Sequence, residues 1–154
     1  MSDTIQIAHP IIARPAASRA AAYVELTKPR IGIMVLIATC VGYYVSIPAE
    51  TMSAAWSMRL LITLVGTGLV AIGANALNQC LEARHDALMP RTAERPLPSG
   101  RLSQWEAVLF GVITGLAGTC VLGLWVNGLS AALAALTFLS YVFVYPPLKR
   151  VTPL

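Results

Sequence analysis

The stretch Asn75-Ala-Leu-Asn-Gln-Cys-Leu-Glu-Ala-Arg-His-Asp86 carries amide and acidic side chains at the end of an otherwise apolar run. Four of its polar side chains share one face of a predicted helix: Asn75, Asn78, Glu82 and Asp86. Their spacings of three, four and four residues place them within a stripe of roughly 80°. Residues 60–77, which overlap the start of this stretch, contain no charged side chain and are long enough to span a membrane. The sequence therefore predicts a transmembrane helix that ends in a polar face at the membrane surface.

The composition of the whole chain is that of an integral membrane protein. Its 154 residues are 56% hydrophobic and 12% charged, whereas soluble domains carry about 25% charged residues. Apolar stretches of suitable length occur at residues 31–47, 60–81, 107–126 and 129–145. We therefore expect an all-α integral membrane protein with about four transmembrane helices.

The positive charges are placed as expected for a membrane protein. Of the eleven Lys and Arg residues, only Arg59 lies outside residues 1–30, the central loop 82–106 and the C-terminal end. The net charge of +4 therefore indicates an oriented membrane protein and no nucleic-acid partner. By the positive-inside rule, both termini and the central loop are cytoplasmic. We expect a bacterial inner membrane, while the Ala- and Arg-containing stretch 9–22 leaves the mitochondrial inner membrane as an alternative.

The chain outside the spans divides into a tail and a membrane domain. Residues 1–22 are predicted to form a flexible tail, and residues 23–154 the domain. A short helix at residues 20–27 is expected along the membrane surface, ending before Pro29 because the residue ahead of a proline avoids helical angles.

Local signals describe the connections between the spans. The prolines and glycine of residues 96–100 predict a stiff, turn-forming loop. Ser103 and Glu106 predict a capping box at the start of the third span. Gly111 and Gly115 are expected to serve close helix packing. Three isolated cysteines are expected to be small buried side chains without disulfides: Cys40, Cys80 and Cys120.

The polar face has the donors of a metal site. Glu82 and Asp86 are one helical turn apart, and a divalent cation between them would relieve their repulsion. Mg²⁺ is the expected ion because it prefers oxygen ligands and is commonly shared with substrate phosphates. Cations that could hold such a phosphate follow in the loop, at Arg91, Arg95 and Arg101. The alternative is a solvated helix end whose acids pair with neighbouring arginines.

A phosphate site at a membrane surface implies a substrate with a phosphorylated head and a lipid tail, such as an isoprenyl diphosphate. The small residues Gly68 and Ala71, deeper on the same face, would leave room for the tail or would serve helix packing.

Several segments carry a resemblance to a known family. They are Glu25-Leu-Thr-Lys-Pro-Arg30, Asn75-Ala-Leu-Asn-Gln79, Asp86-Ala-Leu-Met-Pro-Arg-Thr92, Arg95-Pro-Leu-Pro98 and Tyr145-Pro-Pro-Leu-Lys-Arg150. Together with the acidic stretch they resemble the UbiA-type membrane prenyltransferases, and within that superfamily the protoheme IX farnesyltransferase (heme O synthase) family. The resemblance covers residues 23–154 and implies the first half of a bundle of about nine transmembrane helices.

The resemblance implies a transferase of heme biosynthesis. The reaction would be the Mg²⁺-dependent transfer of farnesyl from farnesyl diphosphate to a vinyl group of heme B, giving heme O. Matching position by position implies that three residues serve catalysis and hold the metal: Asn78, Glu82 and Asp86. Five residues would bind the diphosphate: Lys28, Arg91, Arg95, Tyr145 and Lys149. Tyr145 as an interfacial aromatic and Lys149 as a topogenic charge are the alternatives.

Other interpretations concern the acceptor and the extent of the chain. A related enzyme would prenylate an aromatic quinone precursor, and an inactive half-protein would bind prenyl diphosphate without transferring it. The family carries a second acidic motif that this chain does not contain. We therefore expect residues 1–154 alone to be inactive and to require a C-terminal half or a second chain.

Overall fold

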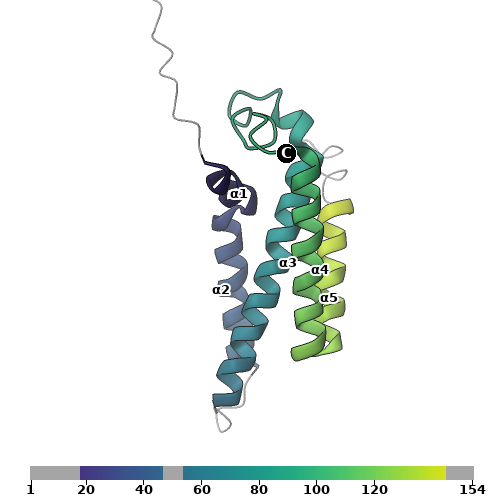
Figure 1. Cartoon of the computed structure of the whole chain (residues 1–154). Helices are drawn as coiled ribbons and strands as arrows, with labels where there is room; N and C mark the ends of the chain where they lie inside the picture. The colour runs from purple at the N-terminus through teal and green to yellow at the C-terminus, as the bar shows by residue number, and fades with distance from the viewer. Residues whose placement is uncertain (1–17, 47–53, 145–154) are drawn as a thin grey trace, which may run out of the picture.

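The computed structural model describes residues 18–46 and 54–144, and within them the chain is helical (Figure 1). The elements are α1 (Arg19–Thr27), α2 (Pro29–Val45), α3 (Ala54–Asp86), α4 (Gln104–Trp125), α5 (Gly128–Leu139) and the π-helical turn η2 (Ser140–Val144). The predicted all-α class is confirmed for these residues. Most of the predicted tail lies outside them, as do Tyr145 and Lys149. Residues 19–22 of that tail belong to α1, which begins at Arg19, and the division into tail and domain stays a prediction.

Two helices are long and apolar enough to cross a membrane by length and composition. They are the 31 residues Trp56–Asp86 and the 22 residues Gln104–Trp125. The apolar helices Pro29–Val45 and Gly128–Phe143 are shorter. A helix of 17 residues such as α2 is about 25 Å long, which is less than the roughly 30 Å of a hydrocarbon core. The described part of the chain thus has membrane-protein character, and four spans remain a prediction.

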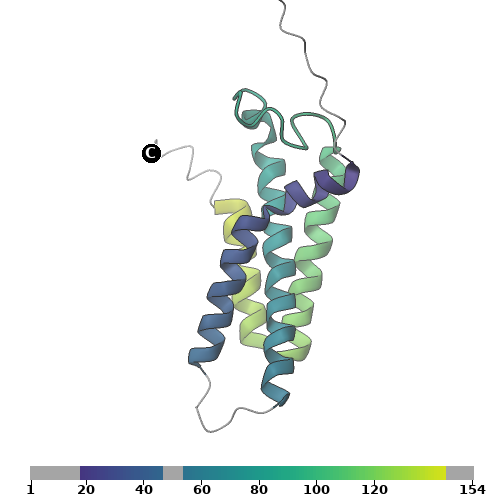
Figure 2. The same cartoon turned by 90° about the vertical axis from the view of Figure 1, so that its left-hand side faces the viewer.

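Helices α3 and α4 touch through their backbones. A Cβ atom added to Gly73 would lie 2.5 Å from the carbonyl oxygen of Gly111 and 2.6 Å from the amide nitrogen of Gly115. No side chain fits in that space, so the glycines allow the two backbones to meet. The predicted packing role of Gly111 and Gly115 is confirmed. In both views α2 and α4 lie on opposite sides of α3 (Figures 1 and 2).

Helix α1 lies across one end of the bundle and covers parts of α3 and α4 (Figure 2). Ala22 and Leu26 are fully buried in a cluster that includes Ala76 and Cys80 of α3 and Ala107 of α4. This apolar face explains why such a short helix docks, because a nine-residue helix is marginal by itself.

Polar and aromatic contacts fasten the same helix to α4. The ring of Tyr23 meets the ring of Phe110 edge-on, with centroids 5.3 Å apart. Arg19 forms an ion pair with Glu106, which also completes the predicted capping box with Ser103 at the start of α4. The first turn of α4 is therefore both capped and tied to α1.

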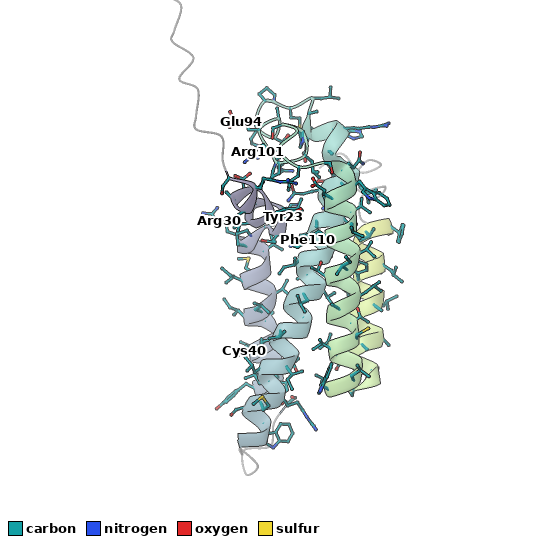
Figure 3. All side chains as sticks on the ribbon, viewed as in Figure 1. Tyr23, Arg30, Cys40, Glu94, Arg101 and Phe110 are labelled. Atoms are coloured by element: carbon teal, nitrogen blue, oxygen red, sulfur yellow. The ribbon has the colours of Figure 1, made fainter. Side chains whose placement is uncertain are left out.

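The central loop folds back on itself in turns. The amide of Leu102 donates to the carbonyl of Pro96 at 3.1 Å, and Pro96 is fully buried. The guanidinium of Arg101 donates to both carboxylate oxygens of Glu25, at 2.6 and 3.3 Å, and to the carbonyl of Glu94 at 2.6 Å. Figure 3 shows Arg101 between the loop and α1. The loop is thereby fastened to α1, in agreement with the predicted stiffness.

The expectation for the cysteines is correct for one of them. Cys80 is buried, but Cys40 and Cys120 are exposed on α2 and α4. An apolar thiol in a transmembrane helix gains little by facing the bundle, because lipid is as apolar as the protein interior. The buried positions predicted for Cys40 and Cys120 are therefore wrong.

Candidate functional site

The last turns of α3 open onto a polar cavity of about 220 Å³ between α3, the central loop and the turn before α2. Six of the predicted site residues line it: Lys28, Asn78, Glu82, Asp86, Arg91 and Arg95. They come from three separate segments that only the fold brings together. Tyr145 and Lys149 lie outside the described residues.

Asp86 is held firmly at the end of α3. Its side chain is about one-tenth exposed, and Oδ2 accepts a hydrogen bond from Nη1 of Arg95 at 2.6 Å. Its backbone carbonyl accepts from the buried hydroxyl of Thr92 at 2.8 Å. The pairing of an acid with a neighbouring arginine, which the sequence left as an alternative, is therefore present at Asp86. Asp86 nevertheless lines the polar cavity, so its carboxylate can also face a ligand there.

Asn78 is the buried polar group of the site. It is 2% exposed, and its Oδ1 atom has no hydrogen-bond partner among the described residues. Leaving a buried polar atom unsatisfied costs roughly 1–3 kcal/mol. An amide oxygen in this state, in the lining of a polar cavity, is suited to accept a ligand.

The donors of the cavity fit a magnesium ion shared with a phosphate group. The residues that the structure describes contain no group of three His, Cys, Asp or Glu side chains suited to a metal. The cavity offers instead the carboxylates of Glu82 and Asp86 and the unsatisfied amide oxygen of Asn78. Mg²⁺ is commonly held by one or two carboxylates, with waters and substrate phosphates completing its shell. This donor set therefore suits a Mg²⁺ ion that is bound together with a phosphate-containing ligand.

Lys28 reaches the cavity from the junction of α1 and α2. Its backbone is left-handed, with φ 49° and ψ 66°, and within residues 18–46 and 54–144 it is the one non-glycine residue with positive φ. Lys28 and Arg95 also line a neighbouring groove of about 590 Å³, together with Glu25 and Arg30. Lys28 and Arg95 therefore lie between the polar cavity and this groove.

An apolar cavity of about 370 Å³ adjoins the polar one deeper in the bundle. Ile31 and Tyr141 line both cavities, so they share a wall. The small side chain of Ala71 lines the apolar cavity, as the sequence allowed. Gly68 does not line it, because it faces Leu36 of α2 instead.

Two residues of the predicted polar group have other roles. The side chain of Asn75 donates to the carbonyl of Thr27 at 3.1 Å, and it lines the apolar cavity. Arg101 is bound to Glu25 and does not line the polar cavity. Neither residue therefore joins the cation and oxygen cluster.

Two further residues were not singled out from the sequence. Tyr141 contributes to both cavities from η2. Gln79 is 3% exposed and donates to the carbonyls of Leu26 at 2.9 Å and Glu25 at 3.3 Å. The available signal for Gln79 was its polarity inside a membrane helix, where amides rarely occur without a role.

Comparisons with known proteins show the family of the chain. The sequence profile of the UbiA prenyltransferase family matches residues 35–154. The chain is 47% identical over 135 residues to a protoheme IX farnesyltransferase of Solibacter usitatus, covering 84% of this chain and 46% of that protein. It is 41% identical over 133 residues to the mitochondrial protoheme IX farnesyltransferase of Arabidopsis thaliana, covering 86% of this chain and 30% of that protein.

A bacterial relative of similar identity is the protoheme IX farnesyltransferase of Legionella pneumophila (strain Lens), 42% identical over 132 residues, covering 84% of this chain and 43% of that protein. The chain thus spans less than half the length of these curated relatives. No solved structure matches it significantly.

Proposed function

Because the chain belongs to the UbiA prenyltransferase family, we propose that its two adjoining cavities together bind an isoprenyl diphosphate. The observation that carries the proposal is the wall shared through Ile31 and Tyr141, which sets a cationic, oxygen-rich cavity directly against an apolar one. The diphosphate lies in the polar cavity and the hydrocarbon tail in the apolar cavity. This division matches a molecule with one highly charged end and one wholly apolar end.

The cations of the polar cavity bind the diphosphate. Lys28, Arg91 and Arg95 line the same space from different segments and can contact different phosphate oxygens. When the bond between the allylic carbon and the diphosphate oxygen breaks, the electron pair leaves with the diphosphate. Fixed cations stabilise the negative charge that develops there.

Asn78, Glu82 and Asp86 are the residues that would hold Mg²⁺ beside the diphosphate. When bound, this ion neutralises charge on the phosphate oxygens and thereby favours their departure. The support within the chain is the unsatisfied, buried Oδ1 of Asn78. Arg95 already neutralises part of the charge of Asp86, so the acidic pair is tolerated before a ligand arrives.

The apolar cavity binds the tail and keeps water from the reacting carbon. Its walls include Val35 of α2, Val70 of α3 and Leu133 of α5. The acceptor carbon then attacks the allylic carbon as the diphosphate leaves, and a proton is lost or water is added to complete the product.

We propose farnesyl transfer to a vinyl group of heme B, giving heme O, as the activity of the complete protein. The support is that relatives at 41–47% identity are named protoheme IX farnesyltransferases. Because this chain spans less than half of their length, the complete site would include a C-terminal half or a second chain. The location would be the bacterial inner membrane, with the loop 82–106 and both termini cytoplasmic.

A second candidate is binding of prenyl diphosphate by this chain without transfer. It is favoured by the short donor set, because two carboxylates and one amide provide only part of the shell of a single Mg²⁺ ion. An isolated chain that binds the diphosphate but forms no product would support this candidate.

Titration with farnesyl thiodiphosphate, a poorly reactive analogue, tests the proposal on the protein in lipid nanodiscs. Binding should require Mg²⁺ and should weaken about tenfold or more in Asp86→Asn, as expected for the loss of a charge-assisted contact. Arg84→Gln is the matched control, because Arg84 lies on the same helix but does not line the cavity. Equal affinity in all three proteins would contradict the proposal.

The acceptor is tested on the complete enzyme with heme B and with 4-hydroxybenzoate, an aromatic quinone precursor. Product from heme B alone supports the heme assignment. Product from the benzoate alone would replace it with the quinone-precursor alternative.

A further inference from the structure

Two amide side chains of α3 hold the end of α1. The Nε2 atom of Gln79 donates to the carbonyls of Leu26 and Glu25, at 2.9 and 3.3 Å. The Nδ2 atom of Asn75, one turn away on α3, donates to the carbonyl of Thr27 at 3.1 Å. These carbonyls belong to the last turn of α1, where the helix supplies few further amides; that of Glu25 also accepts a backbone bond, from the amide of Lys28.

Both amides are buried deeply enough to fix this contact. Asn75 is 2% exposed and Gln79 is 3% exposed. A buried amide that loses its partner is left unsatisfied, so sliding or lifting of the α1 end is opposed at three carbonyls. The position of the last turn of α1 relative to α3 is therefore defined.

Lys28 is the next residue after that turn, and its own backbone is fixed on both sides. Its amide donates to the carbonyl of Glu25 at 3.3 Å, and its carbonyl accepts from the amide of Ile31 at 3.0 Å. Its left-handed backbone conformation is one that residues other than glycine rarely adopt. This conformation caps the C-terminus of α1, and it fixes the backbone from which the Lys28 side chain reaches the polar cavity.

We infer that Asn75 and Gln79 are positioning residues that direct Lys28 at the anionic group bound in the polar cavity. Gln79 is adjacent in sequence to Asn78, so one helix both carries the oxygen donors and sets the cation opposite them. The inference rests on the proposed diphosphate site, and it adds a role for two amides that do not line the polar cavity.

A double-mutant cycle tests this inference with the protein in lipid nanodiscs and inorganic pyrophosphate with Mg²⁺ as the probe. Gln79→Met keeps the length of the side chain and removes the donor. We expect Gln79→Met and Lys28→Met each to weaken pyrophosphate binding about fivefold to tenfold, and the double variant to lose no more than Lys28→Met. Binding of farnesol, which has the tail and no diphosphate, should stay unchanged.

Gln104→Met is the matched control. The amide of Gln104 also donates to a backbone carbonyl of α3, that of Cys80 at 3.4 Å, but Gln104 lines neither the polar cavity nor the groove beside it. This variant should bind pyrophosphate as the unaltered protein does. Should Gln79→Met fail to fold, Asn75→Leu removes the contact to Thr27 and enters the same cycle with Lys28→Met, read by pyrophosphate affinity alone because Asn75 also lines the apolar cavity.

The outcomes separate this inference from the proposed function. Fully additive losses from Gln79→Met and Lys28→Met, or an equal loss of farnesol binding, would show a merely structural role and overturn the inference. Unaltered pyrophosphate binding in Gln79→Met, with Asp86→Asn impaired, would overturn it while leaving the proposed site intact. Failure of the unaltered protein to bind pyrophosphate would overturn both.

Discussion

The guanidinium of Arg95 lies 2.6 Å from Oδ2 of Asp86, so a candidate diphosphate-binding cation is paired with a candidate metal-binding carboxylate. The pair joins the central loop to the end of α3 at the border of the polar cavity. It lowers the electrostatic cost of keeping the acidic side chains of Glu82 and Asp86 close together before any ligand binds. A metal ion and its anion would engage the same two side chains, so ligand binding and this ion pair are coupled.

Arg95→Gln should affect the binding of Mg²⁺ and the binding of pyrophosphate differently. Removing the guanidinium leaves Asp86 without its cation, so affinity for Mg²⁺ alone should be unchanged or rise a few-fold. Affinity for pyrophosphate should fall about tenfold because a charge-assisted contact is lost. Calorimetric titration measures both, with Arg84→Gln as the control. A parallel fall in both affinities would contradict the account, since it would point to general damage of the site.

Asn78→Leu should remove binding without destabilising the protein. The Oδ1 atom of Asn78 is buried and has no partner among residues 18–46 and 54–144, so replacing the amide by an apolar group of similar size should change stability by about 1 kcal/mol or less, in either direction. Mg²⁺-dependent binding of pyrophosphate should be lost.

Asn75→Leu is the matched control for Asn78→Leu, because the amide of Asn75 is bonded to the carbonyl of Thr27. It should lower the free energy of unfolding by about 1 kcal/mol or more. Thermal unfolding in detergent, followed by circular dichroism, compares the two variants. A large destabilisation by Asn78→Leu would mean that its amide is structural.

Lys28→Gly should stabilise the junction of α1 and α2 and still impair the site. Glycine adopts φ 49° without the penalty of about 1–2 kcal/mol that other residues incur. Thermal stability should therefore hold or rise, while pyrophosphate affinity falls about tenfold. Lys28→Met, which loses the charge and retains the strain, should lose affinity without gaining stability. Full binding by Lys28→Gly would remove Lys28 from the site.

Gly73→Ala should push α3 and α4 apart. The new methyl group would lie 2.5 Å from the carbonyl oxygen of Gly111, and such overpacking costs about 1–3 kcal/mol. Gly42→Ala in α2 is the control, because a Cβ there meets nothing within 4 Å. Thermal unfolding in detergent should show a loss of stability for Gly73→Ala alone. Equal stability of the two variants would contradict the close backbone contact of α3 and α4.

Features encoded by local sequence were predictable. The capping box of Ser103 and Glu106 and the end of α1 before Pro29 follow from side-chain chemistry over a few residues. The gathering of Asn78 and Asp86 on one face follows from helical periodicity. Such signals need no knowledge of which elements become neighbours.

Contacts between distant segments were not predictable in the same way. The crosswise docking of α1, the bonds from Gln79 to its last turn and the pairing of Arg101 with Glu25 join residues far apart in sequence. The spacing of polar residues in the sequence predicts which face of a helix is polar, but it does not predict which other segment packs against that face. Arg101 was accordingly grouped with the phosphate-binding arginines, although its guanidinium fastens the loop to α1.

Photolabelling shows directly whether one ligand occupies both the polar and the apolar cavity. The probe is a prenyl diphosphate analogue with a diazirine in its tail, applied to the protein in lipid nanodiscs and located by peptide mass spectrometry. We expect Mg²⁺-dependent labelling of apolar-cavity residues such as Thr67, Val70 and Leu133, suppressed by pyrophosphate and by Asp86→Asn. Labelling confined to the outer, lipid-facing surfaces of the helices, indifferent to Mg²⁺ and pyrophosphate, would contradict this expectation.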